Sequence, residues 1–175
     1  TSASSNTFNG DYIQGSGGAE GVVLSASQCN TISQSTVTGN TASGSSGGVL
    51  VTGSSSNTIS ALSMSGDNGL SLDPDSGNNV ISNSVINIKP SPALYYSYVS
   101  SGASNKVTQS SFTGYFGVIL SSKASFNTIS LSTITSSSDT ALTIITLATV
   151  TVDNSYIQGS TAVWVSASTG TALSD

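Results

Sequence analysis

The sequence predicts an all-β solenoid whose coils each contain three short parallel strands. Two observations lead to this fold class: a four-residue phrase recurs along the chain, and apolar residues follow each copy at regular intervals. Apolar and polar residues alternate as they do in strands, and the helical period of about 3.6 residues is missing. We therefore expect a single domain over residues 1–175, with about seven coils of 22–27 residues each.

The recurring phrase marks the first strand of each coil. Its full form is Asn-Thr-Ile-Ser, and the last of its seven copies has lost the asparagine. Since side chains in a strand alternate between the two faces, the central apolar residue of each copy should point into the core. Full and partial copies occupy residues 6–9, 30–33, 57–60, 79–82, 105–108, 127–130 and 150–153.

A second apolar residue follows the central residue of every copy after a constant gap of five positions. This gap leaves room for one tight corner and predicts a second inward-facing strand. We expect both members of each pair to lie in one core. The pairs are Phe8/Ile13, Ile32/Val37, Ile59/Met64, Ile81/Ile86, Val107/Phe112, Ile129/Ile134 and Val152/Ile157.

The third strand is indicated by an apolar-x-apolar triplet that always follows Gly or Ala. All the variation in coil length falls in the two turns that flank this triplet, so we expect two corners of variable length. The inward-facing pairs expected in the third strand are Val22/Leu24, Val49/Val51, Leu70/Leu72, Leu94/Tyr96, Val118/Leu120, Leu142/Ile144 and Val163/Val165.

The combined pattern, Gly-Val-x-Leu followed by Ser-x-Asn-Thr-Ile-Ser, resembles the right-handed parallel β-helices of the pectin lyase-like superfamily. The resemblance extends from residue 2 to about residue 168. It implies the right-handed fold and says little about activity, because the superfamily includes lyases, hydrolases, adhesins and phage fibres. Its lyases typically use Asp-bound calcium with an Arg or Lys base, and its hydrolases use clustered aspartates.

A column of asparagines begins six of the seven copies of the phrase. Stacked amides can hydrogen-bond to one another and to the backbone of the turn, which satisfies groups that a buried corner would leave unpaired. A row of amides could also bind a ligand, but we interpret the column as a structural ladder. Its members are Asn6, Asn30, Asn57, Asn79, Asn105 and Asn127.

The outward positions of the first strand are rich in Thr and Ser, and such an array resembles the ice-binding faces of β-helical antifreeze proteins. Val80 and Lys106 interrupt the array in its middle. Exposed threonine is also a good strand former without any ligand. Ice binding is therefore the third of the functions considered.

The outward position of the third strand is unexpectedly apolar. A solvated strand should be polar at this position, whereas stacked apolar residues form a stripe of the kind that marks an interface. We call this set the lateral stripe and expect it to contact a protein. Its members are Val23, Leu50, Tyr95, Ile119 and Trp164.

Candidate catalytic residues are few, because the chain has no Arg or His and its three lysines are dispersed. Asp67, Asp73 and Asp75 form the one close acidic group in the sequence. Their oxygens could bind calcium, but Asp, Asn, Gly and Pro are also ordinary turn residues. We interpret the three aspartates as turn residues and expect no enzyme activity, no metal site and no cofactor.

Aromatic residues near the fourth and fifth coils leave a carbohydrate-binding or carbohydrate-active protein as the alternative function. Rings such as those of Tyr95, Tyr96 and Tyr115 could stack on sugars or cover a turn. Nucleic acid is not expected as a partner, since the net charge is −5 and only 6% of residues are charged. No apolar run approaches the length of about 20 residues needed to span a bilayer.

The two ends of the repeat array suggest what the chain could contact there. Residues 2–7 echo residues 25–31, and residues 165–168 match residues 24–27, so both ends read as ordinary coils without caps. We expect either a segment of a longer solenoid or a protomer that stacks on copies of itself. The leading hypothesis is an extracellular or cell-surface structural protein that assembles into a fibre, filament or surface layer.

Overall fold

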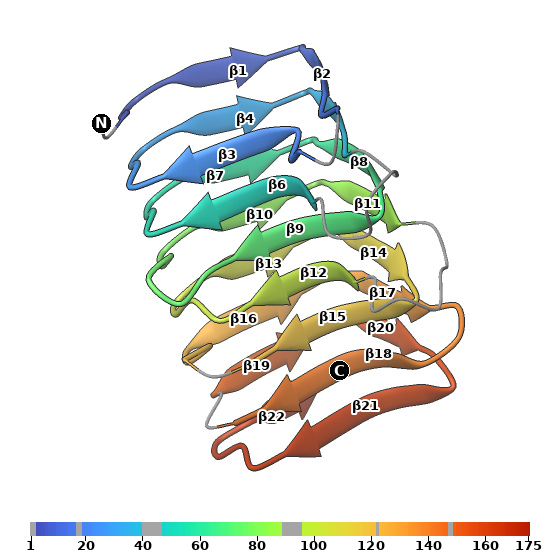
Figure 1. Cartoon of the computed structure of the whole chain (residues 1–175). Coiled ribbons are helices and arrows are strands. Elements are labelled where there is room, and N and C mark those ends of the chain that lie inside the picture. Colours follow the sequence, from blue (N-terminus) through green and yellow to red (C-terminus); the bar gives the residue numbers. More distant parts are fainter. Residues whose placement is uncertain (1–2, 17–18, 40–46, 89–95, 122, 147–148) are drawn as a thin grey trace.

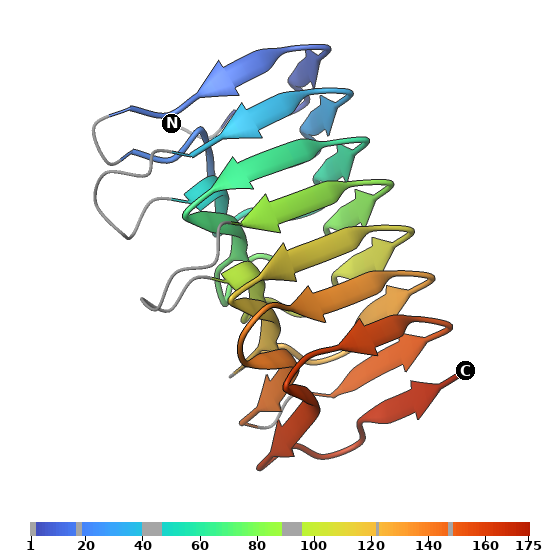
Figure 2. The ribbon, with the colours of Figure 1, turned by 90° about the vertical axis from the view of Figure 1, so that its right-hand side faces the viewer.

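The computed structural model describes residues 3–16, 19–39, 47–88, 96–121, 123–146 and 149–175. In these residues the chain winds into a solenoid of three parallel sheets, and no helix interrupts them. β1 (Thr7–Asn9) and β22 (Ala172–Ser174) lie at opposite ends of the rod (Figure 1). Figure 2 shows the strands of successive coils stacked directly over one another along the rod. The expected all-β solenoid is therefore confirmed.

The first sheet is formed by the recurring phrase. Its strands pair in parallel so that the central apolar residues stack, for example Ile32 on Ile59. This sheet contains eight of the described strands. They are β1, β4 (Thr31–Ser33), β7 (Thr58–Ser60), β10 (Val80–Ser82), β13 (Lys106–Thr108), β16 (Asn127–Ser130), β19 (Val150–Asp153) and β22.

The second sheet follows the tight corner and contains seven of the described strands. Its inward column stacks the residues expected from the gap of five, such as Val37 on Met64 and Phe112 on Ile134. The strands are β2 (Tyr12–Gln14), β5 (Thr36–Thr38), β8 (Ser63–Gly66), β11 (Val85–Ile88), β14 (Ser111–Gly114), β17 (Thr133–Ser136) and β20 (Tyr156–Gln158).

The third sheet also has seven described strands and completes each coil. Leu70 stacks on Val49, and Val118 stacks on Leu142, as the triplet pattern predicts. The strands are β3 (Val22–Ser25), β6 (Gly47–Thr52), β9 (Asn68–Leu72), β12 (Tyr96–Ser100), β15 (Phe116–Leu120), β18 (Thr140–Ile145) and β21 (Thr161–Ser166).

One continuous apolar core fills the space between the three sheets. Ile59, Met64 and Leu70 come from the three strands of one coil and are at most 1% exposed. The same columns lose their cover at the ends of the rod, where Phe8 is 38% exposed and Ile157 is half-buried. The core is therefore closed along the sides of the solenoid and open at its ends.

The tight corner between the first and second sheets explains the constant gap of five. One residue in each corner adopts a left-handed backbone conformation, which lets the chain turn sharply from the first sheet into the second. Gly10 takes this position in the first coil with φ of 74°. The other residues at this position, with φ between 45° and 51°, are Gln34, Ala61, Asn83, Gln109, Leu131 and Asn154.

The expected register of the third strand is wrong in the fourth coil. Tyr98, rather than Leu94, pairs with Leu70 and Val118, and Ser100 takes the place expected for Tyr96. Tyr98 is 1% exposed and its ring packs on Phe112 with centroids 5.5 Å apart. Leu94 lies outside the described residues.

Candidate functional site

The six asparagines of the predicted ladder stack at the corner between the third and first sheets. The Oδ1 atom of each asparagine from Asn30 to Asn127 accepts a hydrogen bond from the main-chain N–H of the preceding asparagine, at 2.8–3.0 Å. Side-chain Nδ2 atoms add bonds of 3.0–3.1 Å to the same oxygens in the first four steps. Val150 takes the next place in the column and ends the ladder.

The side-chain amides of the ladder make hydrogen bonds within the protein. Besides the ladder bonds, the Nδ2 atoms of Asn79 and Asn105 donate to the main-chain oxygens of Ser54 and Ser76 at 3.1 and 3.0 Å. Each of the five asparagines from Asn30 onward is at most 2% exposed. A ligand could reach them only after the corner opens, so the arrangement favours a structural role for the column.

A second ladder, made of serines, follows the left-handed residue of the tight corner and was not predicted. Ser84 Oγ donates to the main-chain oxygen of Ser82 at 2.8 Å and accepts from the N–H of Leu62 at 3.2 Å. Leu62 replaces serine in its own coil. The sequence signal was a serine three residues after the central apolar residue of the phrase. The ladder consists of Ser35, Ser84, Ser110, Ser132 and Ser155.

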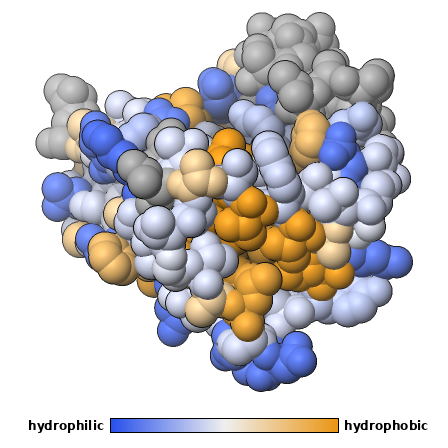
Figure 3. Space-filling model, turned by 90° about the horizontal axis from the view of Figure 1, so that it is seen from below, coloured by the Kyte–Doolittle hydropathy of each residue, from blue (hydrophilic) through white to orange (hydrophobic). Residues whose placement is uncertain are grey.

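The C-terminal end of the rod exposes a cross-section of the core. β22 extends the first sheet beyond β19, whereas the second and third sheets end at β20 and β21. A hollow of about 350 Å³ opens beneath these last strands. Figure 3 shows apolar side chains gathered in the centre of this end face. The hollow is lined by Val152, Ser155, Ile157, Ala162, Val163, Leu173, Ser174 and Asp175.

Both end faces carry apolar side chains that neighbouring coils would otherwise cover. At the C-terminal end Leu173 is 51% exposed, and Val165 is 44% exposed although its column partner Ile144 is fully buried. At the N-terminal end Phe8 is exposed, and Ile13 and Val22 are half-buried beside the core. The two faces thus present the same three inward columns in the same order around the rod.

The lateral stripe is only partly assembled by the fold. Val23 pairs directly with Leu50, and Trp164 and Ile119 flank Thr143, which is 5% exposed. Ser71 and Thr143 interrupt the apolar sequence at this position. Tyr95 lies outside the described residues, and the strand register gives its expected place to Val99.

The three aspartates of the acidic group do not lie together in the structure. Asp67 immediately precedes β9 and is 7% exposed, whereas Asp73 and Asp75 follow the other end of the same strand. No three His, Cys, Asp or Glu side chains in the described ranges are placed to hold a metal ion. The described part of the chain also contains no helix with the length and hydropathy of a membrane span.

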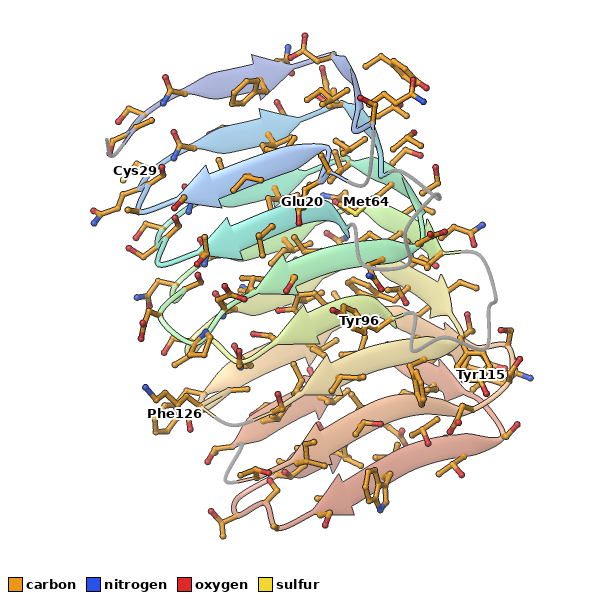
Figure 4. The ribbon with its side chains drawn as sticks, viewed as in Figure 1. Glu20, Cys29, Met64, Tyr96, Tyr115 and Phe126 are labelled. Carbon is orange, nitrogen blue, oxygen red and sulfur yellow. The ribbon has the colours of Figure 1, made fainter. Side chains whose placement is uncertain are left out.

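The aromatic residues near the fourth and fifth coils divide between core and surface. Tyr115 lies at the corner between β14 and β15 (Figure 4). Its ring packs edge-on against that of Phe116, with ring centroids 5.1 Å apart. Tyr96 begins β12 and is half-buried, and burial together with the nearby Asp73 carboxylate raises its pKa. Tyr98 is wholly buried, so it cannot stack on a sugar.

Comparison with known proteins identifies one family. The family described as the right-handed β-helix region matches residues 1–134, well over half of the chain. No curated protein and no solved structure matches the sequence. The three parallel sheets agree with the family match and with the resemblance to the pectin lyase-like superfamily. The chain therefore belongs to the right-handed β-helix family.

Proposed function

We propose that the chain is an extracellular, non-catalytic structural unit that assembles end to end with copies of itself into a fibre, filament or surface layer. The observation that carries this proposal is the apolar end face, with its hollow of about 350 Å³ and the half-exposed Leu173 and Val165. Exposed apolar surface of this kind is favoured at contacts between proteins.

The N-terminal face of a second copy has apolar side chains and open strand edges that could cover this end. It offers Phe8, Ile13 and Val22 as the continuation of the three inward columns, together with the open edges of three strands. An unpaired strand edge readily pairs with another chain. With only 6% charged residues, the protein has little repulsion to oppose this contact. Because successive copies would stack head to tail along one solenoid axis, the contact would repeat without closing and generate a filament.

Sedimentation velocity over a range of protein concentrations tests the proposal with two matched valine variants. Val165→Asp places a charge on the end face, and Val85→Asp places the same charge at a 53% exposed position on the side of β11. We expect large assemblies for the wild-type chain and for Val85→Asp, and monomers for Val165→Asp. Equal behaviour of the two variants, both checked by circular dichroism, contradicts the proposal.

A mixing experiment separates end-to-end contact from side-by-side contact. Phe8→Asp damages the N-terminal face and leaves the C-terminal face intact, which is the opposite of Val165→Asp. Neither variant should form filaments alone, while an equimolar mixture should yield a dimer through the one intact pair of faces. A mixture that remains monomeric, or that forms long filaments, excludes head-to-tail stacking through these faces.

A further inference from the structure

The sequence contains two Asn-Gly dipeptides, and the fold places them in opposite environments. Asn9 ends β1, and Gly10 lies in the tight corner that leads into β2 (Figure 1). Asn68 and Gly69 begin β9, which lies between β6 and β12 in the middle of the third sheet. The same chemical unit is therefore found once at a corner and once within a central strand.

An Asn-Gly unit can modify itself without an enzyme. The main-chain nitrogen of the glycine attacks Cγ of the asparagine, and the side-chain NH2 leaves with the glycine N–H proton as ammonia. Water then opens the succinimide ring that has formed. Opening at one carbonyl gives aspartate, and opening at the other gives isoaspartate, whose main chain runs through the former side chain. Glycine favours the attack because it has no Cβ to obstruct it.

The Asn9–Gly10 unit meets the structural requirements for this reaction. Both residues are exposed, and a Cβ at Gly10, where φ is 74°, would have no neighbouring atom within 4 Å. The Gly10 N–H donates to the main-chain oxygen of Ser33 at 3.1 Å, so attack requires this corner bond to open. Ser33 Oγ donates to Asn9 Oδ1 at 2.8 Å and thus places a donor on the oxygen that becomes negatively charged during attack.

This accessibility belongs to the side of the solenoid rather than to its end. Ser33, which stacks on Asn9 in the second coil, is half-buried rather than buried although strands pair with β4 on both sides. Gln34 takes the place of Gly10 in the second coil and is exposed. A further coil packed on β1 would therefore leave the Asn9–Gly10 unit open to water.

The Asn68–Gly69 unit lacks these properties. Asn68 is 7% exposed and Gly69 is buried. A Cβ at Gly69 would collide with the main-chain oxygen of Ser97 in the next coil, so the main chain has little room to rotate toward the succinimide. Reaction at this site requires local opening of β9, and central strands are among the last parts of a fold to open.

We propose that Asn9–Gly10 is a self-modification site at which the folded protein deamidates, whereas the fold protects Asn68–Gly69. Isoaspartate adds one carbon atom to the main chain between β1 and β2, where the repeat allows no variation in length. The insertion weakens the pairing of β2 with β5, since strand register depends on the length of the corner. Conversion to ordinary aspartate adds only a negative charge. This inference does not depend on the proposed self-assembly.

Peptide mapping by mass spectrometry after incubation at mildly alkaline pH tests the site. In the folded 175-residue chain, Asn9 should deamidate at least about tenfold faster than Asn68, because β9 must open first. In concentrated urea the ratio of the two rates should fall towards one. An equal or faster reaction at Asn68 in the folded chain, no reaction at Asn9, or a ratio that urea leaves unchanged overturns the proposal.

Two glycine variants test whether Gly10 supplies the attacking nitrogen. Ala61 adopts φ of 49° at the equivalent corner, so Gly10→Ala should fold. Its Cβ obstructs the attack, and deamidation of Asn9 should slow about tenfold. Gly53→Ala is the control, because Gly53 has φ of 54° and equally open surroundings but does not follow an asparagine. An unchanged rate in Gly10→Ala overturns the proposed reaction.

Hydrogen exchange tests the effect of the modification on the corner. The isoaspartate form, separated by chromatography, is compared with the unmodified chain and with Asn9→Asp, which carries the charge on an ordinary main chain. Amides of β2 should exchange faster in the isoaspartate form only. Equal protection of β2 in all three proteins overturns the inferred weakening of the first coil.

Discussion

Individual polar residues stabilise this fold mainly by forming hydrogen bonds with backbone groups that would otherwise be buried without a partner. Asn57 shows this at the corner between the third and first sheets, where its Oδ1 accepts from both the N–H and the Nδ2 of Asn30. Its own Nδ2 donates to Asn79 Oδ1 and to the main-chain oxygen of Ser27. The side chain is 1% exposed, so water cannot replace these bonds.

Asn57→Ala should therefore destabilise the protein strongly. The variant leaves donors of Asn30 buried without an acceptor, and we expect a loss of about 3 kcal/mol in the free energy of unfolding. Asn87→Ala is the matched control, because Asn87 is an exposed asparagine on the outward side of β11, and its effect should stay below about 0.5 kcal/mol. Urea denaturation followed by circular dichroism measures both. Equal effects would show that the ladder contributes no stability.

Tyr98 is the residue whose ionisation should affect stability. Burial raises its pKa above the ordinary value of 10.0, and the nearby Ser100 hydroxyl offsets part of this rise. The Tyr98 Oη atom is buried without a hydrogen bond of ordinary geometry. The folded state therefore keeps the proton at a pH where the unfolded chain releases it. This contribution to stability is complete below pH 10 and is lost as the pH rises further.

Tyr98→Phe should remove this dependence on pH. Above pH 10 the wild-type chain should lose about 1.4 kcal/mol of stability per pH unit through this one group. The Phe variant lacks the ionisable hydroxyl, so its stability should fall less steeply over the same range and should be at least equal at pH 7. Tyr156→Phe, at a 59% exposed tyrosine, provides the control with the wild-type slope. Parallel slopes for all three proteins between pH 9 and pH 12, measured by urea denaturation, would contradict the expectation.

The strands show which parts of the fold the sequence can predict. The first two strands of each coil were predicted because one left-handed residue fixes the corner length and the inward residues are apolar. In β12 the inward position of Ser100 is polar, so the apolar-x-apolar pattern pointed to an earlier segment. β22 was missed because its segment has lost the asparagine, as the seventh copy has, and also has alanine at the position of the first threonine. The repeat pattern predicted ends without caps, but it did not predict that β22 extends the first sheet beyond β19.

The tight and variable corners should differ in their tolerance of insertions. One glycine inserted between Asn83 and Ser84 shifts β11 by one residue and turns Ile86 toward solvent. We expect a loss of about 3 kcal/mol or more, as for removal of a large apolar side chain from a core. One glycine inserted between Pro74 and Asp75 lies in a corner whose length already varies and should cost less than about 1 kcal/mol. Thermal unfolding measures both variants, and comparable losses would show that the corner length is not fixed.

At the scale of the whole molecule, the solenoid combines closed sides with open ends. Its sides are sheets whose core columns are fully covered, whereas Leu173, Val165 and Phe8 remain exposed at the ends. The carboxylates of Asp67 and Asp73 are separated by the length of β9. These exposed apolar side chains lie where the proposed end-to-end contact would form.

We expect no turnover of polygalacturonate or similar acidic polymers by the purified chain, with or without calcium. The product would be detected as new unsaturated ends or reducing ends. Calcium-dependent turnover that disappears in Asp73→Ala or Asp75→Ala would show that these turn residues form a catalytic site. Ser71→Ala, on the outward side of the same strand β9, would be the control that retains any such activity.

Cryo-electron microscopy of the assembled 175-residue chain tests end-to-end stacking most directly. Filaments should have the solenoid axis along the filament axis, with the C-terminal face of one copy on the N-terminal face of the next. Seven coils spaced about 4.8 Å apart give an expected axial repeat of about 34 Å per protomer. Filaments in which the solenoids pack only through their sides, or a protein that stays monomeric at every concentration, would contradict the proposed assembly.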